Sequence, residues 1–213
     1  AFLTLALLSQ CMVKVRYEEM LPHEVVDARK KMPVAYLSIG TLEWHGEHLP
    51  LGYDGVKAHA MAIKAAEKCG GLAFPPLFWG DNREQILEFA IDTDGKVSER
   101  MELPKSNFSP GYMHKSSNDQ NIFYIELLIN MLREIESLGF KAIVIFAGHY
   151  PLLGHARAAV EQYMILGKAK AWAVSGYEIV KDIIPDAGDH AGKWETSLLM
   201  SLRPDQVDMN RLP

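Results

Sequence analysis

The chain has 213 residues, of which 48% are hydrophobic and 23% charged, as is ordinary for a soluble globular protein. A nucleic-acid binder normally carries a basic stripe, so the formal net charge of −5 argues against a nucleic-acid partner. The length favours one domain, residues 1–213, and a chain of this size buries a large core without disulfides. The two cysteines, Cys11 and Cys69, therefore indicate a reducing, cytoplasmic setting.

The first ten residues are apolar but too few to cross a bilayer, and no other stretch resembles a membrane span. They lack the basic segment and the small-residue cleavage site of a secretory leader. We therefore expect a cytoplasmic protein without a membrane partner. An exported protein with a leftover leader is the alternative.

The first half of the chain predicts a helix end, a strand, a helix and a second strand. The basic residues 29–31 suit the C-terminal end of a helix. Residues 34–39 are a short apolar run closed by a glycine, which is typical of a buried strand. Residues 55–68 place apolar side chains at helical spacing, and Cys69, beside two glycines that end the helix, suits a small buried thiol. Residues 72–78 favour a strand near a sheet edge, because they contain two adjacent prolines.

The second half begins with an unusual polar segment, residues 81–120, which we interpret as a long loop or insertion with one hairpin arm at residues 88–91. Loops of this length are uncommon and usually functional. A helix is predicted at residues 121–138, and residues 142–147 are a β-branched run typical of a parallel strand covered on both faces. A helix, a strand and the start of a last helix follow at residues 154–166, 171–175 and 194–201.

The alternation of strands and helices predicts an α/β protein with right-handed crossovers and a mostly parallel sheet. In such sheets the ligand crevice lies beyond the carboxyl ends of the strands. The polar loops after residues 34–39 and after residues 142–147 both fall at this edge. We therefore expect the chemistry of the protein there.

The loop after the first strand carries five ionisable groups between Glu43 and Asp54. Carboxylate oxygens and imidazole nitrogens are ligand types for Zn²⁺, Mn²⁺ and Fe²⁺. Glu43 and His45 are two residues apart, so an extended backbone places them on one side, and a proline-containing turn can bring Asp54 back toward them. A solvated loop with unrelated charges is the alternative, and this cluster alone does not decide between the two.

Two further clusters follow. His149 comes one residue after a glycine that ends the strongest predicted strand, so it points into the crevice unless it caps the next helix. His190 is a candidate proton shuttle, because imidazole titrates near neutrality. Glu195 falls in the first turn of the last predicted helix, where interaction with the helix dipole is a strong alternative to a chemical role.

No competing catalytic motif is present. The sequence lacks a Gly-x-Ser-x-Gly elbow, a phosphate loop, a Gly-x-Gly-x-x-Gly fingerprint and a His-Glu-x-x-His pair. The remaining histidines of interest, His48, His59 and His155, are interpreted as structural groups.

The three clusters together resemble the signatures of the creatininase family, the creatinine amidohydrolase-like proteins. The first family signature is similar to Gly-Ser-x-Glu-Gln-His-Gly-Pro-His-Leu-Pro-Leu-x-x-Asp, and residues 40–54 read Gly-Thr-Leu-Glu-Trp-His-Gly-Glu-His-Leu-Pro-Leu-Gly-Tyr-Asp. Residues 147–152 resemble the family's Asn-Gly-His-x-x-Asn, and residues 190–197 resemble its His-Ala-Gly-x-x-Glu-Thr-Ser. The resemblance implies a three-layer α/β/α sandwich and a homo-oligomer, with the hexamer as a common form.

The resemblance also implies a centre for one or two divalent ions, Zn, Mn or Fe. Its implied metal ligands are Glu43, His45, Asp54 and His149, of which Asp54 is suited to bridge two ions. Pro151 stands where some relatives carry a further ligand glutamate, so Glu195 is taken as the fifth ligand.

His190 matches the proposed proton-transfer histidine of the family, and it is the catalytic residue that we predict. We expect Tyr150 and Trp194, which lie within the matched motifs, to bind the substrate.

The functional hypothesis is hydrolysis of a C–N bond in a small cyclic or linear amide by metal-activated water. One alternative is a deformylase or N-glycoside hydrolase that acts on a nucleotide-derived compound. Basic residues that could bind the phosphate of such a compound are Arg83, Lys115 and Lys193. The other alternative is a catalytically inactive relative that binds a metal or ligand, as the departures at Pro151 and Leu152 indicate. These departures and the long segment 81–120, which would reshape the pocket, argue against creatinine itself.

Overall fold

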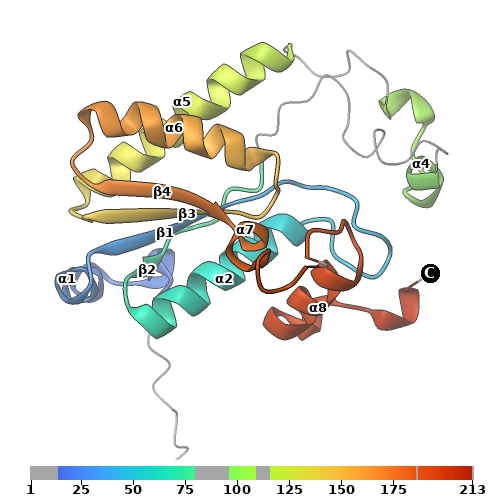
Figure 1. Cartoon of the computed structure of the whole chain (residues 1–213), viewed down its shortest axis with the longest axis horizontal. Helices are drawn as coiled ribbons and strands as arrows, with labels where there is room; N and C mark the ends of the chain where they lie inside the picture. Colours follow the sequence, from blue (N-terminus) through green and yellow to red (C-terminus); the bar gives the residue numbers. More distant parts are fainter. Residues whose placement is uncertain (1–13, 80–95, 109–115, 186, 213) are drawn as a thin grey trace, which may run out of the picture.

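A parallel four-stranded sheet lies at the centre of the computed structural model, which describes residues 14–79, 96–108, 116–185 and 187–212 (Figure 1). Its strands are Val34–Ile39 (β1), Leu72–Ala73 (β2), Ala142–Ala147 (β3) and Lys170–Ser175 (β4). They are arranged in the order β2-β1-β3-β4, and β1 pairs with β3 along its whole length. The prediction of a mostly parallel sheet is confirmed.

The helices connect these strands and flank them. The α-helices in the described residues are Pro22–Lys31 (α1), Tyr53–Cys69 (α2), Lys96–Arg100 (α4), Ser117–Ser137 (α5), Leu152–Leu166 (α6), Gly176–Val180 (α7) and Lys193–Leu202 (α8). The 3-10 helices there are Tyr17–Glu19 (η1), Lys105–Phe108 (η2), Pro204–Gln206 (η3) and Met209–Arg211 (η4). None of the helices in this described part is long and apolar enough to cross a bilayer.

Both faces of the sheet are covered, because successive residues of a strand point to opposite faces. On one face, Leu37 and Ile145 pack with apolar residues of α5 and α6. On the other face, the rings of Tyr36 and Phe146 pack against a stripe of alanines on α2. Figure 1 shows α5 and α6 on one side of the sheet and α2 on the other. The expected α/β/α sandwich is therefore confirmed.

Several element boundaries differ from the predictions. The strand predicted at residues 72–78 is shorter, because Pro75 and Pro76 have no N–H to donate, although the chain continues beside β1 at the sheet edge. The helix predicted to start at residue 121 starts at Ser117, where the Ser116 side chain accepts the N–H of Asp119.

The prediction for Cys69 was wrong. Its thiol is free and exposed, because it is the last residue of α2 and lies on the outer side of that helix. The predicted helix end at residues 29–31 is confirmed as the last turn of α1. Within the long segment 81–120 the structure describes α4, η2 and the start of α5, whereas the predicted hairpin arm at residues 88–91 lies outside the described residues.

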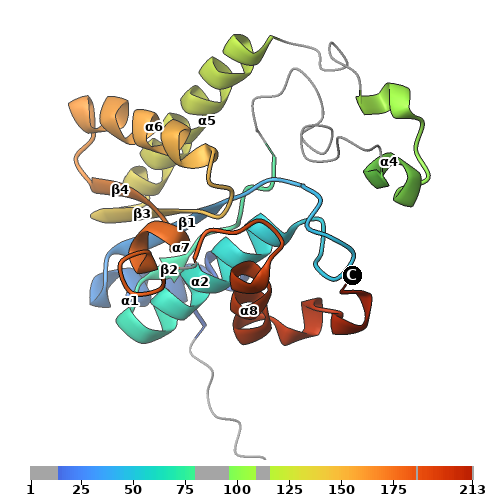
Figure 2. The same cartoon turned by 45° about the vertical axis from the view of Figure 1, so that its right-hand side comes forward.

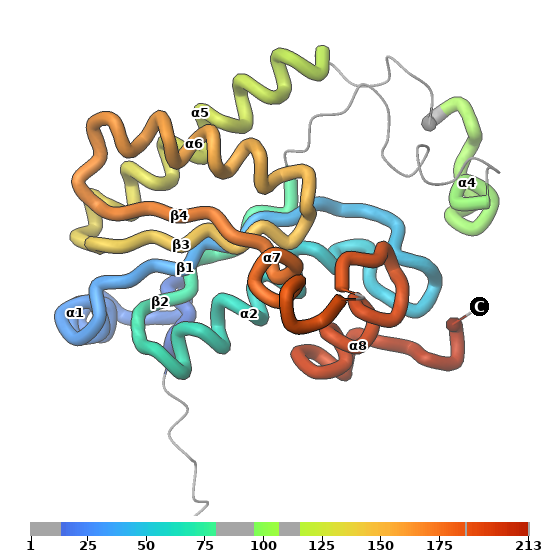
Figure 3. The backbone as a smooth tube through the Cα atoms, viewed as in Figure 1, coloured from blue at the N-terminus to red at the C-terminus, as the bar shows by residue number. Residues whose placement is uncertain are grey.

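The carboxyl ends of β1, β3 and β4 lie at one edge of the sheet because these strands are parallel. The smooth tube of Figure 3 shows that the loops leaving this edge meet the N-terminal end of α2 and the turn before α8. Helix α8 lies beside α2, as Figure 2 also shows. The last segment is tied to the loop after β1, because the N–H of Asp208 donates to the carbonyl of His48 over 3.0 Å. This edge is therefore built from segments far apart in the sequence.

Candidate metal centre

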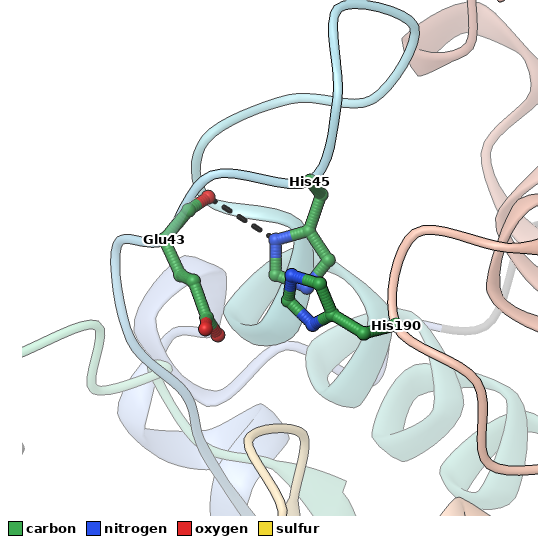
Figure 4. A group of neighbouring side chains, drawn as sticks. All are labelled: Glu43, His45 and His190. Carbon is green, nitrogen blue, oxygen red and sulfur yellow. Dashed lines mark hydrogen bonds between the residues drawn. The ribbon is translucent and has the colours of Figure 1, made fainter. Parts of the chain in front are cut away.

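The loop after β1 directs two side chains into the protein. Thr41, Glu43 and His45 are buried and the residues between them are less so, as expected for extended backbone. The N–H of Glu43 donates to the carbonyl of Leu51 over 2.8 Å and closes the loop. The Nδ1–H of His45 donates to the backbone carbonyl of Glu43 over 3.1 Å (Figure 4). A carbonyl oxygen only accepts hydrogen bonds, so the hydrogen sits on Nδ1 and the lone pair of Nε2 is available to bind a metal ion.

Asp54 enters the same site from the first turn of α2. That turn lies against the ends of β1 and β3 so closely that a Cβ at Gly148 would be 2.0 Å from the carbonyl oxygen of Asp54. A Cβ at Gly40 would be 2.3 Å from the backbone nitrogen of Gly55. Only glycine fits at these two strand ends, and the close packing holds Asp54 at the carboxyl edge of the sheet.

His149, which follows β3, forms with Asp54 and Glu43 a first group of side chains that could bind a metal ion, here called a donor group. Its Nδ1 lies 3.0 Å from Oδ2 of Asp54 and 3.0 Å from Oε2 of Glu43. Burial alone would raise the pKa of Asp54, but the hydrogen bond with His149 and the nearby Lys57 and His45 lower it to about 2. Asp54 is therefore a buried carboxylate in its charged form.

Glu195, in the first turn of α8, completes a second group with His45 and Asp54. Nε2 of His45 lies 3.6 Å from Oδ1 of Asp54 and 3.6 Å from Oε2 of Glu195. Oε2 of Glu195 also accepts the N–H of Ala191 over 2.8 Å, and its Oε1 accepts a hydrogen bond from Lys57 over 2.9 Å. In each group the ligand atoms lie within 4.8 Å of one another, and Asp54 belongs to both.

His190 lies at the exposed side of this cluster. Its Nε2 is 2.9 Å from the carbonyl oxygen of Trp44, so Nε2 carries the hydrogen and Nδ1 is left for other partners. The centre of its ring is 4.4 Å from that of His45. Glu43, His45 and His190 form a third group with metal-ligand spacing (Figure 4), so the position suits either a ligand or a proton donor.

A cavity of about 520 Å³ opens onto these groups. All the predicted site residues line it, namely Glu43, His45, Asp54, His149, Tyr150, His190, Trp194 and Glu195. The ring of Tyr150 meets that of Tyr177 edge to face at 5.7 Å between centres. The convergence of these residues agrees with the sequence analysis, whereas their individual roles stay predictions.

Other predicted residues lie elsewhere. Lys193 is exposed and does not line the cavity, and Arg83 and Lys115 lie outside the described residues. His48, His59 and His155 make structural contacts, as predicted. Their partners are the hydroxyl of Thr196, the guanidinium of Arg16 and the side-chain amide of Asn121.

Sequence reasoning missed three residues of the site. Lys57 is buried beside Asp54, and the spacing of three residues on one helix is the signal that pairs them. Tyr53 is fully buried, and its hydroxyl donates to the carbonyl of Glu195 over 3.1 Å. Asp189 accepts the N–H groups of Trp194 and Glu195, but it lies before the N-cap residue Gly192, so the usual capping position did not indicate it.

A parallel α/β sandwich with buried carboxylates and imidazoles gathered at its carboxyl edge is suited to a divalent-metal enzyme. The chain belongs to the creatininase family, because the family model described as creatinine amidohydrolase matches residues 18–98 and 118–213. This membership confirms the resemblance of the three motifs. The unmatched residues 99–117 lie inside the long segment 81–120, and both the insertion and the single domain stay predictions.

Two relatives extend this result. A creatinine amidohydrolase from Pseudomonas putida is 26% identical over 196 residues, which cover 84% of this chain and 68% of that protein. A mycofactocin precursor peptide peptidase from Mycolicibacterium smegmatis is 28% identical over 176 residues, which cover 83% of this chain and 60% of that protein. The chain thus spans 68% of the length of the first relative and 60% of the length of the second.

Solved structures show the same fold. A structure named Creatininase Mn is similar with a TM-score of 0.66 at 20% identity, over 94% of this chain and 77% of that chain. A mutant creatininase of Zn-Zn type is similar with a TM-score of 0.67 at 21% identity, over the same shares of the two chains.

Proposed function

We propose that this protein is a metal-dependent amidohydrolase that cleaves a C–N bond in a small cyclic or linear amide. The observation that carries the proposal is the pair of donor groups that share the buried Asp54 at the floor of the cavity. The creatinine amidohydrolase relative supports the reaction, and the structures named for Mn and for Zn-Zn support a divalent ion. A small molecule is the proposed substrate.

The donor set fits such an ion. Nε2 of His45 faces two carboxylate oxygens at 3.6 Å, and Nδ1 of His149 lies 3.0 Å from two others, so nitrogen and oxygen ligand atoms alternate as they do around a divalent ion. Nitrogen and carboxylate oxygen together suit Zn²⁺, Mn²⁺ or Fe²⁺. The residues proposed to hold one or two ions are Glu43, His45, Asp54, His149 and Glu195.

Each remaining residue has a role that follows from its position. A divalent ion bound here would supply Lewis acidity, which polarises the substrate carbonyl and activates water at neutral pH. His190, whose Nε2–H donates to the carbonyl of Trp44, takes a proton at Nδ1 from the attacking water and passes that proton from Nδ1 to the leaving nitrogen. Tyr150 and Trp194 line the cavity, and we propose that they hold the substrate and exclude bulk water.

A linear peptide amide is a second candidate substrate. The relative from Mycolicibacterium smegmatis is named as a peptidase, and a peptide bond is the same C–N linkage in a longer molecule. The cytoplasmic setting and the homo-oligomer, including the hexamer, remain part of the proposal, and sedimentation of the purified protein tests the oligomer.

The first experiment is elemental analysis of the purified protein followed by turnover assays. We expect one or two equivalents of Zn, Mn or Fe and hydrolysis of at least one class among creatinine, other cyclic amides, formamides and short peptides. Removal of the metal by a chelator should abolish turnover, and added Zn²⁺ or Mn²⁺ should restore it. A protein that binds neither Zn²⁺ nor Mn²⁺ contradicts the proposal. A metal-loaded protein that hydrolyses none of these compounds supports the alternative of a catalytically inactive relative that binds a metal or ligand.

His190→Gln separates proton transfer from metal binding. The variant should keep its metal, because His190 is not among the proposed ligands, and lose about 10²-fold to 10⁴-fold in kcat. Metal content and single-substrate kinetics measure the two effects side by side. Loss of metal in this variant would instead assign His190 to the third donor group with Glu43 and His45.

A further inference from the structure

Lys57 is a buried lysine in the metal centre to which the proposed mechanism gives no role. It is 8% exposed, although lysines are rarely buried unless they are paired. Its Nζ lies 2.9 Å from Oε1 of Glu195, 3.6 Å from Oδ1 of Asp54 and 4.3 Å from the ring centre of Tyr53. The ammonium group is thus packed among carboxylates and an aromatic face, which both favour a cation.

The net charge of the ionisable side chains in the donor groups and of Lys57 bears on how many divalent ions the centre can hold. Glu43, Asp54 and Glu195 are the carboxylates of the donor groups, and Lys57 is the cation beside them. Asp189 also lines the cavity, but its carboxylate is bound by the N–H groups at the start of α8. The three donor carboxylates and Lys57 together carry a net charge that one divalent ion neutralises. A second divalent ion placed beside Lys57 would be repelled by its ammonium group, and this repulsion is strong in a buried site.

The position of Lys57 distinguishes the two donor groups. Both of its ion pairs are made with members of the group of His45, Asp54 and Glu195. Asp54 divides its oxygens, because Oδ1 faces Lys57 and Oδ2 faces His149. An ion held by Glu43, Asp54 and His149 therefore meets less repulsion than an ion held by His45, Asp54 and Glu195.

We propose that Lys57 acts as a built-in cation that limits the centre to one tightly bound divalent ion. The tight ion binds among Glu43, Asp54 and His149, and a second ion binds only weakly among His45, Asp54 and Glu195. Lys57 is a positioning residue here, since it holds Glu195 by a hydrogen bond and replaces part of the charge of a second ion. This inference rests on the metal centre of the proposed function.

The test is metal stoichiometry in three variants of the whole chain. Lys57→Met removes the charge and keeps a long side chain, and Lys57→Arg keeps the charge. Lys64→Met is the matched control, because Lys64 is exposed on the same helix. Metal-free proteins are titrated with Mn²⁺ by calorimetry and by equilibrium dialysis. Electron paramagnetic resonance then distinguishes an isolated Mn²⁺ from a coupled pair.

The wild type, Lys57→Arg and Lys64→Met should bind one ion tightly and a second ion at least about 100-fold more weakly. Lys57→Met should bind the second ion at least about tenfold more tightly than the wild type and give the coupled spectrum. Two ions of similar affinity in the wild type would overturn the inference even if Lys57→Met does not fold, and would leave the hydrolase proposal standing. A folded Lys57→Met that gains no second ion also overturns it. A wild type that binds no ion contradicts the proposed function itself.

Discussion

Two neighbouring backbone carbonyls orient the imidazole rings of His45 and His190 in the candidate metal centre. The carbonyl of Glu43 accepts Nδ1–H of His45, and the carbonyl of Trp44 accepts Nε2–H of His190. Each contact selects one tautomer and directs the other ring nitrogen away from the backbone. The two histidines are therefore prepared for different tasks, His45 through Nε2 and His190 through Nδ1.

At the residue scale, Asp54→Asn should have the largest effect on metal uptake, because Asp54 belongs to both donor groups and is held in its charged form. We expect the affinity for Zn²⁺ or Mn²⁺ to fall by at least about 100-fold. This exceeds the loss expected when a residue that only hydrogen-bonds to a metal ligand is removed. Equilibrium dialysis measures the change. Glu67→Gln, at an exposed position of the same helix, is the control, and equal metal affinity in both variants would contradict the assignment.

At the element scale, the contact between the first turn of α2 and the strand ends positions the site. The backbone of Asp54 touches Gly148, and the backbone of Gly55 touches Gly40. The backbone of α2 packs directly against the two glycines without side chains between them. The Asp54 side chain can then reach His149, with 3.0 Å between Oδ2 and Nδ1. The same approach would be impossible for any residue with a Cβ.

Gly148→Ala and Gly154→Ala test this contact as a pair. The first should destabilise the protein by about 3 kcal/mol, because its Cβ would overlap the carbonyl oxygen of Asp54. The second lies in α6 with no atom within 4 Å of the added Cβ, so it should stabilise the helix by about 0.5–1 kcal/mol. Urea unfolding of the metal-free proteins measures both. Similar effects of the two substitutions would show that the contact is not tight.

At the scale of the whole molecule, the segment before α1 is fastened to the sheet and to α2. Arg16 forms a bridge with Ala73 of β2, and its guanidinium lies 2.9 Å from Nε2 of His59. Burial, and then the charge of Arg16, lower the pKa of His59 from 6.5 to about 4. His59 is therefore neutral in the folded protein at neutral pH.

This lowered pKa predicts a pH dependence of stability. Between pH 6.5 and about 4 the unfolded chain binds a proton at His59 that the folded protein does not bind, so the free energy of unfolding falls as the pH falls. From pH 7 to pH 5 the wild type should lose about 2 kcal/mol more than His59→Gln. Urea titrations at both pH values measure the difference, with His23→Gln at an exposed position as the control. Parallel losses in the wild type and His59→Gln would refute the assignment.

Local sequence patterns determined much of the fold and the approximate place of the site. The strands at residues 34–39 and 142–147 have the predicted bounds, because a closed run of apolar, β-branched residues indicates its own length. Since parallel strands end at one edge, the polar residues after each strand were expected to meet, and Glu43, His45, Asp54 and His149 do converge.

Only the tertiary structure decided what else shares that edge. Lys57 reads as an ordinary polar position of an amphipathic helix, and it becomes a buried cation because α8 brings Glu195 against it. The short helix α7 and the exposure of Cys69 were not predicted either. The spacing of apolar residues and the presence of turn-forming residues determine local structure over a few positions, so they can be recognised in the sequence. The balance of buried charge depends on which distant segments pack together, so it exists only in the folded molecule.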